Sequence, residues 1–479
     1  MAANPHAPRR PRRFDRNLIV IGAGAGGLVA AYLGAALRAR VTLIERGRMG
    51  GDCLNSGCVP SKALIHAAAA GLDFAAAKAR IEAAITAIAP HDSIARYESL
   101  GVDVRVGEAR LLDPWRVAIG GEILTTRAIV IAAGAAPVIP PLPGLAEAPF
   151  VTSETLWDLA DLPRRLVILG GGPIGCELAQ AFARLGAAVT LVEQAPSLLS
   201  REDDEVSALL AKAMARQGIT RLTGHRALAV TRAGDGFALR VESEGGGEGG
   251  PREIVFDRLL IAIGRKPRVA DYGLEEIGVR LTARGTVETN PWLQTNYPHI
   301  LACGDVVGPW QFTHMAGHQG GIAALNGLFG WLWRLRPQDA AVPAVTFTTP
   351  EVARVGLNER AAREKGINYE VTRYDLAELD RALIEGESEG FVKILTPPGR
   401  DRLLGVTIVG HGAGEMLAPA TLALRHRLGL RKILATIQPY PTRSEALRAA
   451  AGIWRQNHAS PRALAWLARL HAWRRGGEG

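Results

Sequence analysis

The chain has 479 residues, enough for about three domains of ordinary size, and its 48% hydrophobic residues are typical of a folded protein. Only 4 cysteines in this length exclude a secreted disulfide scaffold. The formal net charge is +9, but the arginines are scattered along the chain, so no nucleic-acid partner is expected. An acidic substrate or a membrane surface is compatible with this charge.

Residues 1–16 are rich in Pro and Arg, and we expect them to form a disordered tail. They lack the apolar segment of a secretory signal. No run in the chain reaches the roughly 18 apolar residues that a membrane span needs. The expected location is therefore the cytoplasm.

The first folded segment, 18–45, reads as a strand, a glycine turn, a helix and a second strand that ends in an acid. In such a unit Gly22 forms the tight turn, Gly24 lets a pyrophosphate approach the backbone, and Gly27 lets the helix pack on the strand. Glu45 lies where a ribose hydroxyl partner is expected. The complete unit predicts dinucleotide binding.

The unit repeats at 166–193, with Gly170, Gly172 and Gly175 in the turn and Glu193 at the end of the second strand. Two copies indicate two dinucleotides, or a duplicated fold in which one site no longer binds a dinucleotide. Two functional sites are favoured because neither copy has lost its glycines or its acid. A carboxylate repels a ribose 2′-phosphate, so Glu193 favours NADH, with NADPH as the alternative.

Three later strands run into turns, at Gly134, Gly264 and Asp305. Beyond about residue 340 the pattern changes to antiparallel strands and helices, typical of a separate α+β domain. The expected fold is thus α/β, with two Rossmann-like dinucleotide-binding domains and a C-terminal α+β domain.

Cys53 and Cys58 follow the first unit. A disulfide needs Cα atoms roughly 4.4–6.8 Å apart. Five residues of α-helix rise about 7.5 Å, so the chain between the cysteines must loop. Asn55, Ser56 and Gly57 are loop formers.

Pro60 and the alanine-rich residues after it predict a helix that begins at Cys58, where the helix dipole lowers a thiol pKa. Lys62 adds positive charge one turn further on. A redox pair is the favoured interpretation. Half of a metal site is disfavoured because the chain has no second cysteine pair, and inert thiols are a further alternative. Cys176 and Cys303 are expected to be inert and buried.

The stretch GGDCLNSGCVPSK at 50–62, with the two glycine units, resembles the FAD-dependent pyridine nucleotide–disulfide oxidoreductases, among them glutathione reductase, dihydrolipoyl dehydrogenase and mercuric reductase. The resemblance covers about residues 16–450. It implies FAD on the first glycine unit with Gly51, Asp52 and Asp305, and NAD(P)H on the second. It also implies a homodimer formed through the C-terminal domain.

This resemblance sets the expected domain boundaries. The second glycine unit becomes the NAD(P)-binding domain, inserted between two parts of the FAD-binding domain. Gly134 and Gly264 are included among the cofactor-binding residues. The expected divisions are a tail at 1–16, FAD-binding domain at 17–150 and 269–340, NAD(P)-binding domain at 151–268 and dimerisation domain at 341–479.

The resemblance also implies roles in catalysis. Cys53 would be the exchange thiol that attacks substrate, and Cys58 the thiol beside the flavin. Lys62 would pair with Glu177 near the reactive nitrogen of the flavin, and so serve both cofactor binding and catalysis. Asp52 stands where Thr is common in the family, a departure that would shift FAD without preventing its binding.

One departure concerns proton transfer. In disulfide-reducing members of the family, a His before Pro-Thr acts as acid and base, and a Glu five residues later orients it. Here Glu445 is in place, but the His position holds Tyr440. An ordinary phenol is only about 0.1% ionised at neutral pH, so turnover of ordinary disulfides is expected to be slow. Alternative bases, by chemistry only and each first interpreted as structural or surface residues, are His66, His314, His318 and His411.

Mercuric reductase has a Tyr at this place, so the chain resembles the mercuric-reductase-like branch. Nothing in the sequence resembles the cysteine-containing N-terminal domain of that enzyme, and residues 464–479 lack its vicinal cysteines. These absences argue against mercury itself. No metal-ligating residue is assigned.

Residues 460–475, SPRALAWLARLHAWRR, interleave Trp and Leu with Arg, a pattern typical of interfacial helices. A weak contact with a membrane surface or a partner is one expectation, and packing within the dimer is the favoured alternative.

Three functions therefore remain open. The first is an NADH-dependent FAD enzyme that acts through Cys53 and Cys58 on a metal ion such as mercuric ion, on a protein disulfide or on another small thiol-reactive acceptor. The second is a disulfide enzyme of the dihydrolipoyl dehydrogenase or glutathione reductase type. The third is a membrane- or partner-docked flavoprotein that transfers electrons.

Overall fold

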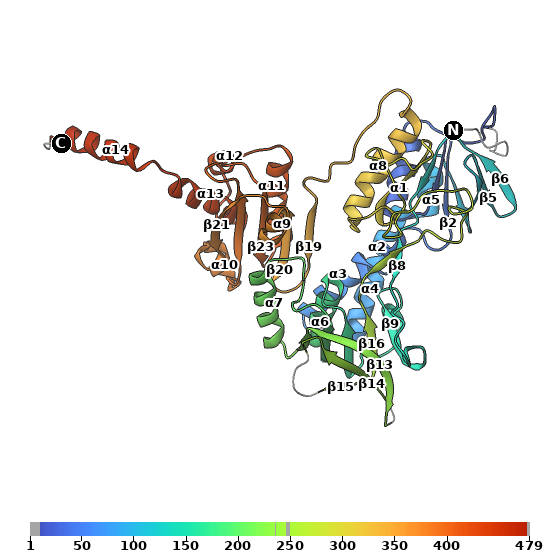
Figure 1. The fold of residues 1–479 in the computed structure, drawn as a ribbon, viewed down its shortest axis with the longest axis horizontal. Coiled ribbons are helices and arrows are strands. Elements are labelled where there is room, and N and C mark those ends of the chain that lie inside the picture. Colours follow the sequence, from blue (N-terminus) through green and yellow to red (C-terminus); the bar gives the residue numbers. More distant parts are fainter. Residues whose placement is uncertain (1–9, 235, 246–249, 477–479) are drawn as a thin grey trace. The chain divides into compact units, whose positions relative to one another are not determined.

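The computed structural model describes residues 10–234, 236–245 and 250–476 (Figure 1). The chain divides into two compact units. The first comprises residues up to 196 and 217–338, and the second comprises 197–216 and the residues from 339 onward.

A parallel five-stranded sheet with the order β18-β7-β1-β2-β3 forms the first half of the first unit. Its central strand is a continuous apolar run whose residues are all buried. Helix α1 follows the first glycine turn and packs against α8. The bounds are β1 Leu18–Ile21, α1 Ala25–Ala36, β2 Val41–Glu45, β3 Val102–Val106, β7 Ile129–Ile131, β18 Ile300–Ala302 and α8 Thr313–Phe329.

A second parallel sheet, β12-β11-β10-β16-β9, repeats this plan around the second glycine turn. An antiparallel meander, β13-β14-β15, accompanies it. The bounds are β9 Phe150–Thr152, β10 Arg165–Leu169, α6 Pro173–Arg184, β11 Ala188–Glu193, β12 Thr220–Thr223, β13 His225–Ala233, β14 Gly236–Ser243, β15 Arg252–Phe256 and β16 Arg258–Ile261. The glycine-rich loop between β14 and β15 includes residues 246–249, which lie outside the described residues.

The cysteine region lies on a helical segment between β2 and β3. Its longest helices, α3 and α4, pack against each other, and α3 also packs against α6. Two short strands, β8 and β17, pair where the chain passes between the two parallel sheets. The bounds are α2 Gly51–Asn55, α3 Cys58–Ala69, α4 Phe74–Ile88, α5 Ile94–Ser99, β4 Arg110–Asp113, β5 Arg116–Ile119, β6 Glu122–Thr125, β8 Ala135–Pro137 and β17 Arg265–Pro267.

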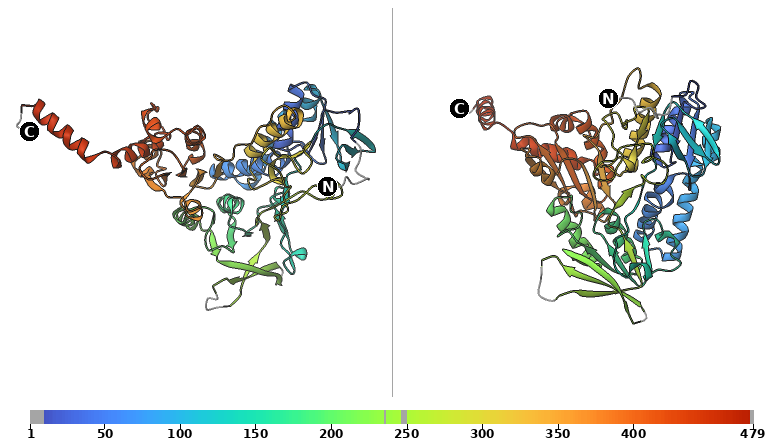
Figure 2. Two further views of the ribbon diagram at one scale, coloured as in Figure 1. Left: turned by 45° about the horizontal axis from the view of Figure 1, so that its top comes forward. Right: turned by 45° about the vertical axis from the view of Figure 1, so that its right-hand side comes forward.

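The second unit is built on an antiparallel sheet, β19-β20-β23-β22-β21, against which α11 and α13 pack (Figure 2). Strands β22 and β23 are buried along their whole length. The bounds are α7 Asp204–Arg216, β19 Pro343–Thr346, β20 Glu351–Gly356, α9 Glu359–Glu364, β21 Glu370–Asp375, α10 Asp380–Glu385, β22 Phe391–Thr396, β23 Gly405–Gly410, α11 Ala413–Arg425, α12 Leu430–Ala435, α13 Glu445–Asn457 and α14 Pro461–Arg474.

The expected fold class is confirmed. Each parallel sheet contains the predicted strand, glycine turn, helix and strand, and the residues beyond 340 form the predicted antiparallel α+β domain. The described end of the predicted disordered tail differs from expectation. Arg16 pairs with Asp103 at 2.8 Å, and Phe14 contacts Trp115 with ring centroids 5.7 Å apart, so these residues have partners on the first unit. Among the described residues, no helix is long and apolar enough to cross a membrane.

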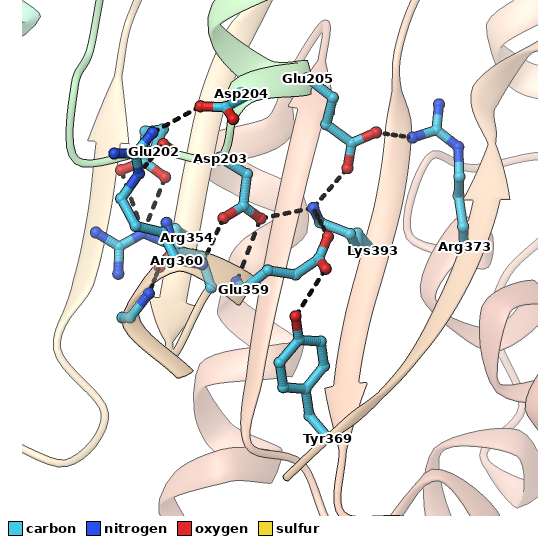
Figure 3. A network of polar contacts seen from close by, with 12 residues as sticks. Glu202, Asp203, Asp204, Glu205, Arg354, Glu359, Arg360, Tyr369, Arg373 and Lys393 are labelled. Atoms are coloured by element: carbon cyan, nitrogen blue, oxygen red, sulfur yellow. Dashed lines mark hydrogen bonds and ion pairs between the residues drawn. The ribbon is translucent and has the colours of Figure 1, made fainter. Parts of the chain in front are cut away.

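A buried ammonium holds α7 to the sheet of the second unit (Figure 3). Lys393 on β22 is 3% exposed, and its Nζ lies 2.5 Å from Asp203, 2.5 Å from Glu205 and 2.8 Å from Glu359. Burial opposes the charge of Lys393, but its hydrogen bonds with these carboxylates raise its pKa above the ordinary value. The three carboxylates are close enough together to hold a metal ion, yet the ammonium already lies among them.

Candidate functional site

The two cysteines of the predicted redox pair lie together at the junction of α2 and α3. Cys53 is on the short helix α2, which ends at Asn55, and Cys58 is the first residue of α3. The side chains of Cys53 and Cys58 are hydrogen-bonded to each other, and the Cys58 Sγ is 3.4 Å from the Thr313 Oγ1 at the start of α8. The predicted break between the cysteines and the predicted helix start at Cys58 are both present.

The surroundings of this pair favour one thiolate and one thiol. The hydrogen bond from Cys53, with the contact to Thr313 and the charge of Lys62, lowers the pKa of Cys58 to about 5. The pKa of Cys53 is raised, because its proton is held in the hydrogen bond to Cys58 and because the thiol is partly desolvated. At neutral pH the reduced pair therefore carries its negative charge on Cys58 and its proton on Cys53.

Lys62 and Glu177 form the ion pair that the family resemblance implies. The Lys62 Nζ lies 2.7 Å from the Glu177 Oε2, and the Glu177 side chain is 6% exposed. Lys62 is one turn beyond Cys58 on α3, while Glu177 is on α6, in the second half of the first unit. The pair therefore links the thiol helix with the helix that follows the second glycine turn.

Cys58 opens on a small cavity of about 350 Å³ between α3 and α4. Lys62 and His66 contribute to its wall from α3, and Arg80 and Ile88 contribute from α4. No carboxylate lines this cavity among the described residues, so the approach to Cys58 is electropositive. His66, which the sequence indicated as a packing residue on the same helix face as Lys62, lies in this wall.

A larger cavity of about 670 Å³ lies over the first glycine turn. Six of the predicted cofactor-binding residues line it: Gly22, Gly24, Glu45, Gly51, Asp52 and Gly134. A Cβ placed on Gly24 would meet no atom of the chain closer than 3.9 Å, so this backbone is open to a ligand. Helix α1 has no side-chain cap and no acid in its first turn, which suits a pyrophosphate. The volume and these groups fit FAD.

Gly22 and Gly27 serve the turn itself. Gly22 has a φ of +101°, and a Cβ on Gly27 would lie 1.8 Å from the carbonyl oxygen of Gly22. Gly170 and Gly175 repeat this geometry in the second glycine turn. Gly170 has a φ of +117°, and a Cβ on Gly175 would lie 1.9 Å from the carbonyl oxygen of Gly170. A Cβ on Gly172 would meet nothing within 4 Å, and α6 begins without a side-chain cap or an acid in its first turn. The second turn therefore offers the same opening to a phosphate.

Glu45 and Glu193 accept hydrogen bonds from backbone groups at and near the glycine turns. Glu45 accepts hydrogen bonds from the backbone N–H groups of Ala23 and Gly47, at 2.6 and 2.8 Å. Glu193 accepts from Gly171 and Ala195, at 2.5 and 2.6 Å. The carboxylates thus lie beside the turns, where the sequence placed them as ribose partners.

Arg265 is a charged residue of the site that the sequence reading missed. It forms an ion pair with Asp52, and its Nε is 3.8 Å from the Asp305 Oδ2. Burial raises the pKa of Asp305, and Arg265 opposes that effect. Gly264 precedes Arg265 at a φ of +128°, a conformation that favours glycine. Asp52, which stands where Thr is common in the family, therefore has a cationic partner within the first unit.

Tyr440 and Glu445 are both in the second unit, but they are not arranged as a base and its orienting acid. The Tyr440 hydroxyl donates to the Asp380 Oδ2 at 2.8 Å, and the Asp380 carboxylate raises the pKa of the phenol. Glu445 instead accepts from the backbone N–H of Thr442 at 3.2 Å. Asp380 was not found by sequence reasoning, because 60 positions separate it from Tyr440.

Of the other histidines, His314 is adjacent to Thr313 and stacks on Phe312, with ring centroids 5.1 Å apart. His318 accepts a hydrogen bond from the backbone N–H of Gln338. His411 is in the second unit and exposed.

The two remaining cysteines are buried, as the sequence predicted. Burial raises the pKa of Cys303 to about 12, and it raises the pKa of Cys176 as well. Neither thiol is ionised at neutral pH, so the only low-pKa thiol of this site is Cys58.

Comparison with known proteins gives the same assignment along nearly the whole chain. Residues 16–320 match the profile of the pyridine nucleotide-disulphide oxidoreductases, and residues 342–451 match the dimerisation domain of the same proteins. A dihydrolipoyl dehydrogenase of Thermus scotoductus is 37% identical over 462 residues, which span 91% of this chain and 96% of the relative. A mercuric reductase of Bacillus cereus is 34% identical over 454 residues, which span 91% of this chain and 71% of the relative.

Solved structures resemble the chain at similar coverage. The structure described as a Cu(II) complex of HOCl-induced flavoprotein disulfide reductase RclA from Escherichia coli superposes with a TM-score of 0.82 at 29% identity, covering 91% of this chain and 99% of that one. LpdA from Mycobacterium tuberculosis superposes with a TM-score of 0.83 at 26% identity, covering 92% of this chain and all of that one.

Proposed function

The chain belongs to the pyridine nucleotide-disulphide oxidoreductases, which depend on FAD and NAD(P)H, and from this premise we propose that it passes electrons through Cys53 and Cys58 to a thiol-reactive metal ion. The observation that carries the proposal is the paired thiol and thiolate at the start of α3, with the open cavity beside Cys58.

The residues that would hold FAD are those around the larger cavity, above all Gly24, Glu45 and Gly51, with Asp305 and the Lys62–Glu177 pair as further candidates. Bound FAD supplies two-electron transfer between the nicotinamide and the cysteine pair. The chain provides the rest. The start of α3, Thr313 and Lys62 stabilise the thiolate of Cys58, and Cys53 keeps its proton until it reacts.

NAD(P)H gives up a hydride, which is two electrons and one proton. The two electrons break the Cys53–Cys58 disulfide bond, and the proton goes to one sulfur, so one thiol and one thiolate form without net proton uptake. When the acceptor takes the two electrons, the disulfide bond forms again and the thiol proton is released. The thiolate forms on Cys58 and the proton stays on Cys53, as the pKa directions require.

Tyr440 supports a metal ion rather than a disulfide as the acceptor. A disulfide substrate must be protonated as its thiols leave, and a base of suitable pKa speeds that step. The hydrogen bond to Asp380 raises the pKa of Tyr440, so the phenol is less able to exchange a proton at neutral pH than a free tyrosine. A metal ion bound by thiolates needs no such proton. The names of two relatives, a mercuric reductase and a Cu(II) complex of RclA, agree with this acceptor class.

Dihydrolipoyl dehydrogenase is the second candidate, because a relative of that name is 37% identical and covers 91% of this chain. This candidate requires fast oxidation of a dithiol, or fast reduction of a disulfide, without the usual histidine. It therefore predicts a rapid reaction with lipoamide, whereas the metal-ion proposal predicts a slow one.

Two further assignments follow by the same reasoning. We expect NADH to be preferred over NADPH, because the Glu193 carboxylate beside the second glycine turn repels a 2′-phosphate. We expect a homodimer, because residues 342–451 match the dimerisation domain of the family. The relative rates with NADH and NADPH and the mass by light scattering test these two points.

The deciding experiment measures NADH oxidation by the FAD-loaded protein with Hg(II), Cu(II), oxidised lipoamide, oxidised glutathione and a quinone as separate acceptors. Cys53→Ser and Cys58→Ser are the test variants, and Cys303→Ala, which removes a buried thiol outside the pair, is the matched control. Metal-dependent oxidation that is lost in both Ser variants and kept in the control supports the proposal. A rate with lipoamide that far exceeds every metal rate would replace it with the dehydrogenase.

A further inference from the structure

Helix α14, Pro461–Arg474, is an amphiphilic helix with no buried residue. Its large apolar side chains face solvent: Trp466 is 62% exposed, Trp473 is 71% exposed and Leu464 is 54% exposed. Within the second unit, no other described helix or strand lies beside it in Figure 1 or Figure 2. An exposed tryptophan pair on an otherwise unpacked helix has no role in the core of the second unit, whose cluster of buried residues ends at Trp454.

The aromatic side chains share one face of this helix. Trp466, Leu470 and Trp473 follow at positions i, i+4 and i+7, which fall on one stripe of an α-helix. Arg462 and Arg469 are also seven residues apart and border this stripe on one side. A tryptophan and leucine stripe flanked by arginines places rings at the level of lipid headgroups and charges beside the phosphates.

The charge of the segment has one sign. Residues 461–475 contain four arginines, Arg462, Arg469, Arg474 and Arg475, and no acid. In the whole chain 47 residues are acidic, about one in ten, so a stretch with four arginines and no acid carries a local excess of positive charge. Its electrostatic complement is an anionic surface.

The match to the family does not include this helix. It ends at residue 451, within α13, so α14 lies outside the residues that match the dimerisation domain. A segment of the first unit has the same chemistry: 329–336, FGWLWRLR, has no acid, and Trp331 is 74% exposed. The combination of exposed tryptophan, leucine and arginine is thus repeated in the chain.

We propose that α14 docks the protein on an anionic lipid bilayer, lying in the interface with Trp466 and Trp473 among the headgroups and with its arginines on lipid phosphates. The helix does not cross the bilayer, since it has 14 residues. Binding is reversible, because one short helix of this kind holds a protein less firmly than a spanning segment. This inference is independent of the acceptor that Cys53 and Cys58 reduce.

Vesicle flotation of the full-length, FAD-loaded protein tests the proposal. Vesicles of pure phosphatidylcholine are compared with vesicles in which about one third of the lipid is phosphatidylglycerol. The charge variant is R462Q/R469Q/R474Q, and the apolar variant is Trp466→Ala with Trp473→Ala. The matched control is R400Q/R425Q/R455Q, which removes three exposed arginines of the same unit outside α14.

The proposal predicts that the protein floats with anionic vesicles only, and that salt of about 1 M releases it. The partition coefficient of the charge variant between vesicles and buffer should fall about 100-fold, because three arginines no longer attract the anionic surface. The apolar variant should also bind more weakly, while the control binds as the parent does. NADH oxidation and FAD absorbance should be unchanged in all variants, which shows that they are folded.

Two results would overturn the proposal. The first is no flotation of the parent protein, or equal flotation of the parent and the charge variant. The second is dissociation of the dimer by the α14 variants, seen by light scattering in the absence of lipid, which would assign the helix to contact with a second copy of the chain.

Discussion

The ionisation of Cys58 depends most on the hydrogen bond from Cys53, and removing that donor tests the electrostatics of the site. With a pKa of about 5, Cys58 is about 99% thiolate at pH 7, whereas at the ordinary thiol value of 9.0 it would be about 1% thiolate. Cys53→Ala removes the largest cause of the shift, so the Cys58 pKa should rise by more than one pH unit. Cys53→Ser keeps a hydroxyl donor and should give a smaller rise.

Thiolate absorbance at 240 nm, followed from pH 4 to pH 10 in reduced protein, measures this directly. The two buried cysteines should be silent across the range, because burial raises their pKa values to or above about 12. The parent should show one thiolate with a midpoint near pH 5, since a lowered pKa keeps the thiolate above that pH and loses it below. Equal midpoints for the parent and Cys53→Ala would refute the assigned cause.

Three other substitutions probe separate parts of the account. Lys393→Met leaves three carboxylates clustered without their cation and should lower the free energy of unfolding by about 3–5 kcal/mol at pH 7 in urea unfolding. Because the pKa of Asp203 is lowered in the folded state, this loss of stability should shrink as the pH falls below 4. A loss of stability that does not depend on pH would contradict the network. Gly27→Ala places a Cβ 1.8 Å from a backbone oxygen and should abolish FAD retention on gel filtration, so a yellow, stable variant would be unexpected. Glu193→Ala should raise kcat/KM for NADPH relative to NADH, and an unchanged ratio would remove that residue from nucleotide selection.

The sequence predicted those parts of the fold that local patterns encode. The apolar run of β1 followed by a glycine turn predicted the first sheet, and the proline after Cys58 predicted the start of α3. In both cases the residues that determine the structure lie within a few positions of each other. The chain between Cys53 and Cys58 was expected to loop, but Leu54 and Asn55 still belong to the short helix α2, and the break lies at Ser56 and Gly57.

The missed residues act over long sequence separations. Thr313 contacts Cys58 across 255 positions, and Arg265 reaches Asp52 across 213. Tertiary packing creates these contacts, and no periodicity or spacing in a single sequence records them. Asp380 is a similar case, because its carboxylate engages Tyr440 only after α10 and the Tyr440 segment have folded against the same unit.

Thiol labelling after NADH addition measures whether electrons from the nicotinamide emerge at the Cys53–Cys58 pair. The oxidised, FAD-loaded protein is given one equivalent of NADH without oxygen, alkylated and mapped by mass spectrometry. Alkylation should appear at Cys53 and Cys58 only after NADH is added. NADH oxidation that leaves both residues unlabelled, or that labels Cys176 or Cys303 instead, would contradict this electron route.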